Sequence, residues 1–281
     1  MAVQPKLRPS RRAEFDVQID APAKINHFLH VLGRRDDGYH DLQTGFQFLS
    51  WGDTLHWRAS DEFQVTGLEG VAMTDNLIWR AGQALAAASG IQPKGHLHVD
   101  KQIPAGAGLG GGSSDAASAL LLLRQQWGLN VDDITLHQIG TRLGADVPIF
   151  LHGRSAIGTG IGEQLSELDW PECRIDLFMP AVHVPTRNIF MDEVLTRNSE
   201  AINIRAALDG NGHNDCEPVC RRQFPEVDAL FVCLANRQPK LSGSGGTVFV
   251  LDNEVGSSEI AACQVRHLQT RTTNHSSAIQ D

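Results

Sequence analysis

Long hydrophobic runs and a regular cysteine pattern are both missing from this sequence. No apolar run reaches the ~18 residues that a membrane-spanning helix needs, so we expect no membrane partner. The five cysteines are an odd number, lie scattered in the second half of the chain and lack the spacing of a disulfide framework. We therefore expect a soluble protein of the reducing cytoplasm.

An excess of positive charge is missing as well. The formal net charge of −9 at pH 7 argues against a nucleic-acid partner, although it leaves room for a local basic pocket that holds a small anion. The first twelve residues carry Lys6, Arg8, Arg11 and Arg12 and no acidic residue. We expect residues 1–14 to form a flexible basic tail.

A complete set of metal ligands is also lacking. His213, Cys216 and Cys220 lie close together in the sequence, but no second ligand pair follows at a spacing typical of zinc sites. We interpret these cysteines as buried or incidental thiols, and we expect no protein-bound metal.

Glycine, by contrast, is concentrated in one segment. Residues 104–116 read PAGAGLGGGSSDA, after an alternating strand at 97–103 and before an alanine- and leucine-rich helix that ends near Gly128. Unobstructed main-chain N–H groups and a helix N-terminus both favour an anion, so this order of elements predicts a phosphate site. Ser113 or Ser114 is expected to cap the helix.

Two well-known phosphate loops fit this segment poorly. Gly106, Gly108 and Gly111 match G-x-G-x-x-G, but the strand before them alternates, whereas the first strand of a dinucleotide-binding fold is continuously apolar. The Walker A loop needs a lysine where Ser113 stands. A nucleoside triphosphate held here therefore needs positive charge from Mg²⁺ and from a lysine or arginine of another segment.

The rest of the sequence predicts mixed helices and strands, with a soft domain boundary near residue 167. A helix is expected over about 77–88, with Asp75 or Asn76 as its N-cap and Gly90 at its end. Other patterns favour strands at 15–19 and on both sides of Gly52, a helix at 134–143, a strand-rich stretch at 173–184, a helix at 228–237 and a second glycine turn at 241–251.

Three segments taken together resemble the GHMP superfamily of small-molecule kinases. They are APAKIN at 21–26, PAGAGLGGGSSDA at 104–116 and LSGSGGTVF at 241–249. GRRDDGYHDLQT at 33–44, LGADVP at 143–148 and VPTRNIF at 184–190 further resemble one branch of it. That branch uses ATP to phosphorylate the 2-hydroxyl of a cytidine-diphosphate-linked methylerythritol in the non-mevalonate route to isoprenoids.

The resemblance implies an α+β fold of two domains with the active site in the cleft between them. We expect the ATP-binding domain at residues 15–167, a smaller α+β domain at 168–270 and a loose tail at 271–281. It also implies ATP as co-substrate, with Mg²⁺ carried by the nucleotide. The expected ATP-binding residues are Pro104, Ala105, Gly106, Ala107, Gly108, Leu109, Gly110, Gly111, Gly112, Ser113 and Ser114.

Two charged residues receive catalytic roles from the resemblance. Lys24 would stabilise the incipient alkoxide and the transferring phosphoryl group, and Asp146 would be the general base. By its local sequence alone, Lys24 would be an edge-strand lysine facing water and Asp146 a helix-capping or turn residue.

The resemblance also implies a site for the cytidine substrate. Tyr39 and Phe190 would stack on the base, His40 would hydrogen-bond its polar edge, and Asn26 and Thr186 would make polar contacts. For Phe190, packing in the core is an equally good interpretation. The second glycine turn, with Ser242, Gly243, Ser244, Gly245 and Gly246, is expected to close over phosphates, and the alternative is a plain hairpin turn.

Other functions stay open at this point. The chain could be another GHMP kinase that acts on homoserine, mevalonate or a sugar, or a non-catalytic nucleotide-binding relative. DGYH at 37–40 argues against the first alternative, because a pair of ring side chains suited to a base has no use with an aliphatic alcohol. The presence of both Lys24 and Asp146 argues against the second. A monomer and a homodimer are both compatible with the sequence.

Overall fold

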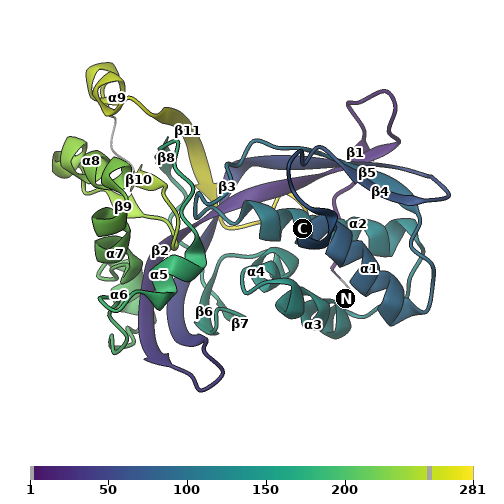
Figure 1. Cartoon of the computed structure of the whole chain (residues 1–281), viewed down its shortest axis with the longest axis horizontal. Helices are drawn as coiled ribbons and strands as arrows, with labels where there is room; N and C mark the ends of the chain where they lie inside the picture. Colours follow the sequence, from purple (N-terminus) through teal and green to yellow (C-terminus); the bar gives the residue numbers. More distant parts are fainter. Residues whose placement is uncertain (1–2, 252–254, 281) are drawn as a thin grey trace.

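The N-terminal part of the chain forms a long antiparallel hairpin that runs through both lobes of the molecule (Figure 1). The computed structural model describes residues 3–251 and 255–280. The hairpin consists of β2 (Val17–Arg34) and β3 (His40–Arg58). Its register first shifts between Pro22 and Lys24, since proline has no N–H for the ladder. The Lys24 N–H instead donates to the carbonyl of Leu109 at 3.0 Å, which brings this strand against the glycine-rich segment.

The first lobe packs helices against one end of this hairpin, and Figure 1 shows them gathered below its strands. The strand β5 (Gly95–Asp100) alternates buried and half-buried residues, as predicted, although it ends three residues before the predicted limit at 103, and its buried face is turned to the helices. Its elements are β1 (Arg8–Pro9), β4 (Phe63–Thr66), η1 (Met73–Asp75), α1 (Leu77–Ser89), β5 (Gly95–Asp100), α2 (Gly111–Gln126), α3 (Asp133–Leu143), α4 (Val147–His152), β6 (Ala156–Gly160) and β7 (Gln164–Glu167).

The second lobe repeats the arrangement of strands backed by helices. Its elements are β8 (Arg174–Met179), α5 (Thr186–Met191), α6 (Ile204–Leu208), α7 (Cys216–Gln223), α8 (Pro225–Cys233), η2 (Ala235–Arg237), β9 (Lys240–Leu241), β10 (Val248–Leu251), α9 (Ser257–Cys263) and β11 (Arg266–Thr273). β11 pairs with both β3 and β8, so one sheet connects the lobes. The observed architecture is α+β, as predicted.

The sheet and the core do not divide at residue 167. That position falls between β7 and β8, but Leu29 and Val31 near the tip of the hairpin share a core cluster with Phe178 and Val219 of the second lobe. The division into domains at 15–167 and 168–270 therefore stays a proposal, and the hairpin belongs to both lobes.

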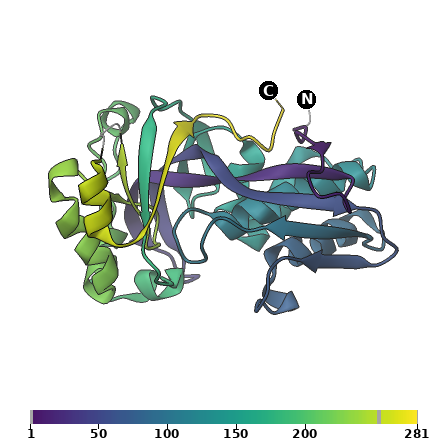
Figure 2. The ribbon, with the colours of Figure 1, turned by 90° about the horizontal axis from the view of Figure 1, so that it is seen from above.

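Over residues 3–14 and 271–280 the structure differs from the expectation of loose tails at 1–14 and 271–281, of which residues 1, 2 and 281 lie outside the described ranges. Arg8 and Pro9 form β1 on β2, Arg12 makes an ion pair with Asp100 at 2.5 Å, and Pro5 bridges to Ile279 near the C-terminus. Figure 2 shows the two ends close together on the same side of the molecule. Local composition missed this order, because it depends on pairing with β2, with Asp100 and, for Pro5 and Ile279, with a partner almost a full chain length away.

The helix boundaries follow the capping signals in two cases and not in the third. α1 begins after Asn76, whose side chain accepts from two backbone N–H groups, and ends at Gly90 in the left-handed region, as predicted. α3 begins after Asp132. α2 begins at Gly111 with Gly110 as its N-cap, so the expected capping by Ser113 or Ser114 is wrong. The Ser114 hydroxyl donates instead to the Pro22 carbonyl at 2.7 Å.

We expect Leu121→Ala to reduce the free energy of unfolding by about 2–5 kcal/mol, because it removes a fully buried side chain of α2 and leaves a cavity. Gln125→Ala, on an exposed position of the same helix, is the matched control and should change stability by less than about 0.5 kcal/mol. Urea denaturation measures both. A small effect of Leu121→Ala would contradict the central place of α2 in this core.

Candidate active site

The glycine-rich segment 104–116 leads from β5 into α2 and folds around two apolar anchors. Ala107 and Leu109 are buried in a central cluster that includes Ile25 of β2 and Leu177 of β8. Between and beside them, glycines at 106, 108 and 110 have positive φ. Because glycines alternate with these two buried residues, the backbone of the loop is held in place at the junction of the lobes.

The second glycine turn lies directly on this loop. The Ser242 hydroxyl donates to the Gly108 carbonyl at 3.0 Å, and the N–H groups of Gly246 and Thr247 donate to Gly106 and Ala107 at 3.2 and 3.1 Å. Gly108 has a φ of +79°, and a Cβ there would overlap the Ser242 carbonyl oxygen. Glycine at this position is therefore required both by conformation and by the close approach of the two loops.

We expect Gly108→Ala to lower the free energy of unfolding by at least about 1–3 kcal/mol, the cost of a left-handed non-glycine residue, with the overlap added. It should also lower kcat/KM for both substrates, because the loops must separate. Gly112→Ala is the matched control: its Cβ would lie 3.4 Å from the nearest side chain, and a glycine in a helix is weaker than alanine. Gly112→Ala should therefore keep or raise stability in urea denaturation. Equal losses for the two variants would contradict this description of the loop.

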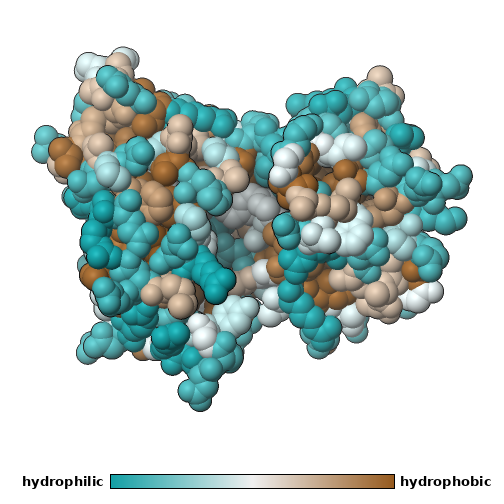
Figure 3. All heavy atoms as spheres, in the orientation of Figure 1, coloured by the Kyte–Doolittle hydropathy of each residue, from teal (hydrophilic) through white to brown (hydrophobic). Residues whose placement is uncertain are grey.

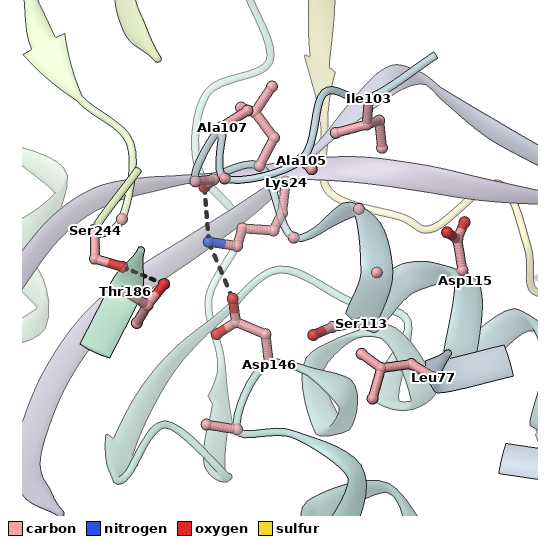
Figure 4. Close-up of a pocket in the computed structure, with 18 of the residues that line it drawn as sticks. Lys24, Leu77, Ile103, Ala105, Ala107, Ser113, Asp115, Asp146, Thr186 and Ser244 are labelled. Carbon is pink, nitrogen blue, oxygen red and sulfur yellow. Dashed lines mark hydrogen bonds and ion pairs between the residues drawn. The ribbon is translucent and has the colours of Figure 1, made fainter. Parts of the chain in front are cut away.

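A cavity of about 500 Å³ opens beside the loop, and Figure 3 shows the surface hollowed between the two lobes. Most residues predicted for the site line it, and Figure 4 shows several of them pointing into it. The predicted residues among its lining are Lys24, Asn26, Pro104, Ala105, Gly106, Ala107, Gly108, Leu109, Gly110, Gly111, Gly112, Ser113, Asp146, Thr186, Phe190, Gly243 and Ser244.

At the centre of the cavity, Lys24 meets Asp146. The Lys24 side chain is 3% exposed, and its Nζ lies 3.3 Å from Asp146 Oδ2, 2.5 Å from Asn26 Oδ1 and 3.1 Å from the Gly108 carbonyl. Asp146 stands at the N-cap position of α4, yet its side chain makes no capping hydrogen bond, and it is 35% exposed toward the cavity. The structure thus favours a role for Asp146 in the cavity over the alternative of a helix cap.

Neighbouring polar groups hold this lysine in place. Asn26 Nδ2 donates to Thr44 Oγ1 at 2.8 Å, and the Thr44 hydroxyl in turn donates to the Phe28 carbonyl at 2.6 Å. Because the Asn26 amide nitrogen donates to Thr44, the Asn26 amide oxygen is directed to Lys24. Asn26 is 2% exposed, so contacts within the β2–β3 hairpin, and not contacts with solvent, fix the position of its side chain.

One end of the cavity has apolar walls with a polar edge. Leu68, Val71, Leu77 and Ile78 supply the apolar walls, and the polar lining residues at this end are Asp75, Asn76, Lys101 and Asp115. Of these residues, the sequence indicated only Asp115 for the site, as part of the predicted phosphate segment 104–116. Asn76 was predicted only as a helix cap and Lys101 only as part of a strand.

The Lys101 ammonium is shared between two buried carboxylates. It contacts Asp53, which also accepts from the Ile103 N–H at 2.9 Å, and it lies 2.7 Å from Asp115. Burial raises the pKa of Asp115 to about 7, against the opposing effect of Lys101. One oxygen of Asp115 is buried without a hydrogen-bond partner. Since two carboxylates neutralise Lys101, this lysine is not a free cation for phosphates.

At the opposite end, α5 brings Thr186 and Phe190 to the cavity wall. The Thr186 hydroxyl lies 3.0 Å from that of Ser244, so the second glycine turn reaches this wall too. Tyr39 and His40 do not belong to the lining among the residues that the structure describes: Tyr39 is 58% exposed on the hairpin tip, and His40 is buried with its ring 5.4 Å from Phe190. Phe190 both packs against the hydrophobic core of the second lobe and faces the cavity.

Several expected residues of the two loops face elsewhere. Ser242, Gly245 and Gly246 lie against the first glycine loop, and Ser114 lies under β2, so none of the four lines the cavity within the described ranges 3–251 and 255–280. Of the second turn, Gly243 and Ser244 reach the cavity. The second turn is therefore a support for the first loop as well as part of the wall.

Three of the five cysteines are buried, at Cys173, Cys216 and Cys220, and Cys233 and Cys263 are half-buried. Cys216 and Cys220 are buried in α7, and burial raises the pKa of both thiols, that of Cys220 to about 12. The described residues contain no group of three or more side chains placed to hold a metal. No described helix is both long enough and apolar enough to span a bilayer.

Comparison with known proteins agrees with this geometry. Residues 76–154, from the α1 cap through the glycine loop to α4, match the family described as GHMP kinases N terminal domain. A 4-diphosphocytidyl-2-C-methyl-D-erythritol kinase of Pseudomonas aeruginosa (strain UCBPP-PA14) is 46% identical over 258 residues, which cover 90% of this chain and 92% of that protein. A kinase of the same name from Xanthomonas oryzae pv. oryzae (strain MAFF 311018) is 46% identical over 82% of this chain and 80% of its own.

Solved structures show the same fold. A crystal structure of a 4-(cytidine 5'-diphospho)-2C-methyl-D-erythritol kinase has a TM-score of 0.75 at 32% identity and covers 91% of this chain and 98% of that one. The Methanococcus jannaschii mevalonate kinase, at 13% identity, covers 94% of this chain and 100% of its own with a TM-score of 0.63, and shows the fold alone. With identity near one half along nearly the whole length, this chain belongs to the 4-diphosphocytidyl-2-C-methyl-D-erythritol kinase family of GHMP kinases.

Proposed function

We propose that this kinase transfers the γ-phosphoryl group of ATP to the 2-hydroxyl of 4-diphosphocytidyl-2-C-methyl-D-erythritol. The name and extent of its relatives support this substrate. The proposed chemistry rests on one observation, the contact of Lys24 Nζ with Asp146 Oδ2 at 3.3 Å. This contact lies in the middle of a cavity that has the glycine loop on one side and α5 on the other.

In the proposed reaction, Asp146 is the general base. Its carboxylate takes the proton of the 2-hydroxyl as that oxygen bonds to the γ-phosphorus, the bond from phosphorus to the β–γ bridging oxygen breaks, and ADP leaves. The carboxylate is suited to this role because it is partly open to the cavity and no capping bond occupies it.

Lys24 has a second part in the proposed step. Its ammonium is nearly enclosed by Asn26, the Gly108 carbonyl and Asp146, so its charge is fixed in place and little screened by water. Negative charge that develops on the attacking oxygen and on the transferring phosphoryl group is stabilised by such a preorganised cation.

The lining residues also fit a Mg²⁺ ion carried by the nucleotide. Within the described ranges the lining holds two lysines and three carboxylates, at Asp75, Asp115 and Asp146, so it does not by itself balance the charge of ATP. Mg²⁺ bound to phosphates needs only one or two protein oxygens. The Asp146 carboxylate and the Ser113 hydroxyl both face the cavity and are the candidates (Figure 4). When bound, the ion would neutralise phosphate charge.

The cytidine moiety is assigned to the α5 end of the cavity. Phe190 offers a ring face in the wall, and Tyr39 is an exposed ring on the neighbouring hairpin tip that can cover the base from outside. Thr186 is the lining hydroxyl assigned to the substrate hydroxyls. Asn26 also lines the cavity, but its amide is bonded to Lys24 and Thr44, so it acts on the substrate through Lys24; His40 lies behind Phe190.

The test is ATP consumption by the purified chain with four alcohols: 4-diphosphocytidyl-2-C-methyl-D-erythritol, homoserine, mevalonate and galactose. We expect turnover with the first, with the product phosphorylated at the 2-hydroxyl by NMR. Turnover with another alcohol alone would assign a different kinase activity, and turnover with none would favour a non-catalytic nucleotide-binding protein.

A further inference from the structure

Arg197 connects the two parts of the proposed base site. It lies in the segment between α5 and α6, and its Nε donates to His40 Nε2 at 3.2 Å. The other two nitrogens of the guanidinium donate to backbone carbonyls, including that of Phe190 at 3.0 Å and that of Asp192 at 2.6 Å. One side chain thus fixes the histidine and the backbone of the aromatic residue that lines the cavity.

The contact determines which nitrogen of His40 carries hydrogen. A guanidinium has donors and no acceptor, so His40 Nε2 must present its lone pair. The pKa of His40 is lowered, first by burial and then by the positive charges of Arg197 and of Arg34 on β2, so the ring is neutral. A neutral ring that accepts at Nε2 carries its hydrogen on Nδ1.

The Nδ1–H group is the free end of this pair. In the described part of the chain it has no hydrogen-bond partner, and it is not one of the enclosed polar atoms that lack one, so it is open to solvent, on a ring whose centroid lies 5.4 Å from that of Phe190. Any group that binds there meets a donor.

We infer that Arg197 is a positioning residue that makes His40 a permanent hydrogen-bond donor and thereby selects cytosine over uracil. This inference rests on the proposed cytidine substrate. Cytosine presents acceptors at O2 and N3, whereas uracil has an N–H at position 3. To accept from that N–H, His40 would need the other tautomer, which would turn its Nε2 hydrogen against the Arg197 donor. A site built in this way rejects uracil, because two donors are left facing each other: either the uracil N3–H faces the His40 Nδ1–H, or the His40 Nε2–H faces Arg197.

The first test is the tautomer itself, measured without substrate. Two-bond ¹H–¹⁵N spectra of the ¹⁵N-histidine-labelled chain at neutral pH should show His40 as the Nδ1–H tautomer, with its signals assigned by their loss in His40→Gln. In Arg197→Gln the amide can accept as well as donate, so a mixture of tautomers is expected. A wild-type His40 that is protonated, or that carries its hydrogen on Nε2, overturns the inference.

The second test compares two substitutions at one position. Arg197→Gln and Arg197→Lys both lose the fork that holds the carbonyls of Leu195, Phe190 and Asp192, but the lysine ammonium still offers donors only. We expect the ratio of kcat/KM for the cytidine over the uridine form of the substrate to fall at least 10-fold in Arg197→Gln, chiefly through KM, and to stay within about 3-fold of wild type in Arg197→Lys.

Arg222→Gln is the control for general loosening. Arg222 lies on α7 and binds the carboxylate of Asp192 at 2.6 Å, in the segment that Arg197 also holds, without contacting His40. Its ratio should equal that of wild type within about 2-fold. An unchanged ratio in Arg197→Gln, or the same change in Arg222→Gln or in Arg197→Lys, overturns the inference. No turnover of either nucleotide by the wild-type chain would overturn the proposed function instead, while the spectra would still report on the Arg197–His40 pair.

Discussion

Replacing Asp146 with asparagine should lower kcat by about 10²–10⁴-fold, the range for loss of a general base, while KM for ATP changes by less than about 3-fold. The asparagine keeps the size of the side chain but cannot take the hydroxyl proton. It should fold normally, because the Asp146 side chain makes no capping bond at α4. Steady-state kinetics with varied ATP and with varied alcohol separate the two parameters.

Asp169→Asn is the control for this substitution, since Asp169 is an exposed carboxylate paired with Arg154 on the surface. Its kcat should equal that of wild type. A near-normal kcat in Asp146→Asn would remove Asp146 from the mechanism, and a large rise in KM for ATP with unchanged kcat would make it a binding residue instead.

Local sequence signals predicted the elements around the site well. Asn76 and Gly90 mark the ends of α1 because capping depends on a few neighbouring residues. The order of alternating strand, glycine loop and helix at 95–126 likewise follows from local periodicity. Such signals say which element forms, and they do not say against what it packs.

The contacts between distant segments could not be read in this way. The Ser242 hydroxyl on Gly108 joins residues 134 positions apart, and the sequence directed that serine to phosphate instead. Lys101 was read as a strand residue, since nothing near it announces the two buried carboxylates that hold it. Arg197 gave no signal, because its partner His40 lies 157 positions away.

The resemblance to a kinase family supplied what periodicity could not. Lys24 and Asp146 are 122 positions apart in sequence, and each had a plain structural interpretation by itself. That the fold brings Nζ and Oδ2 within 3.3 Å, beside the glycine loop, is the physical support for assigning both to one reaction. Tyr39 and His40 show the limit of what the resemblance implies, because they lie outside the cavity lining among the described residues. Arg197 connects His40 to the cavity wall at Phe190.

Replacing Lys24 with methionine should lower kcat by at least about 10²-fold, comparable to removal of a single preorganised donor from an oxyanion site. Methionine fills the space of the aliphatic chain but leaves Asn26 Oδ1 and the Gly108 carbonyl without their cationic donor, so some loss of stability is expected as well. Urea denaturation measures that loss separately from kcat.

The double variant Lys24→Met with Asp146→Asn decides whether the two residues act as a unit. If the ammonium stabilises the same oxygen that the carboxylate deprotonates, the double variant should be little slower than the slower single variant, because the second substitution removes nothing further. Multiplication of the two single effects would instead show that the residues act independently, against the proposed mechanism.

Lys101→Met is the matched control for Lys24→Met, as a second lysine in the lining of the same cavity. Its ammonium is paired with Asp53 and Asp115, so its loss should reduce stability, with kcat at saturating ATP much less affected. Combined with Asp146→Asn, it should give effects that multiply, since no contact joins the two groups in the described structure. The difference between the two lysines in this comparison isolates the role of a cation placed 3.3 Å from the base.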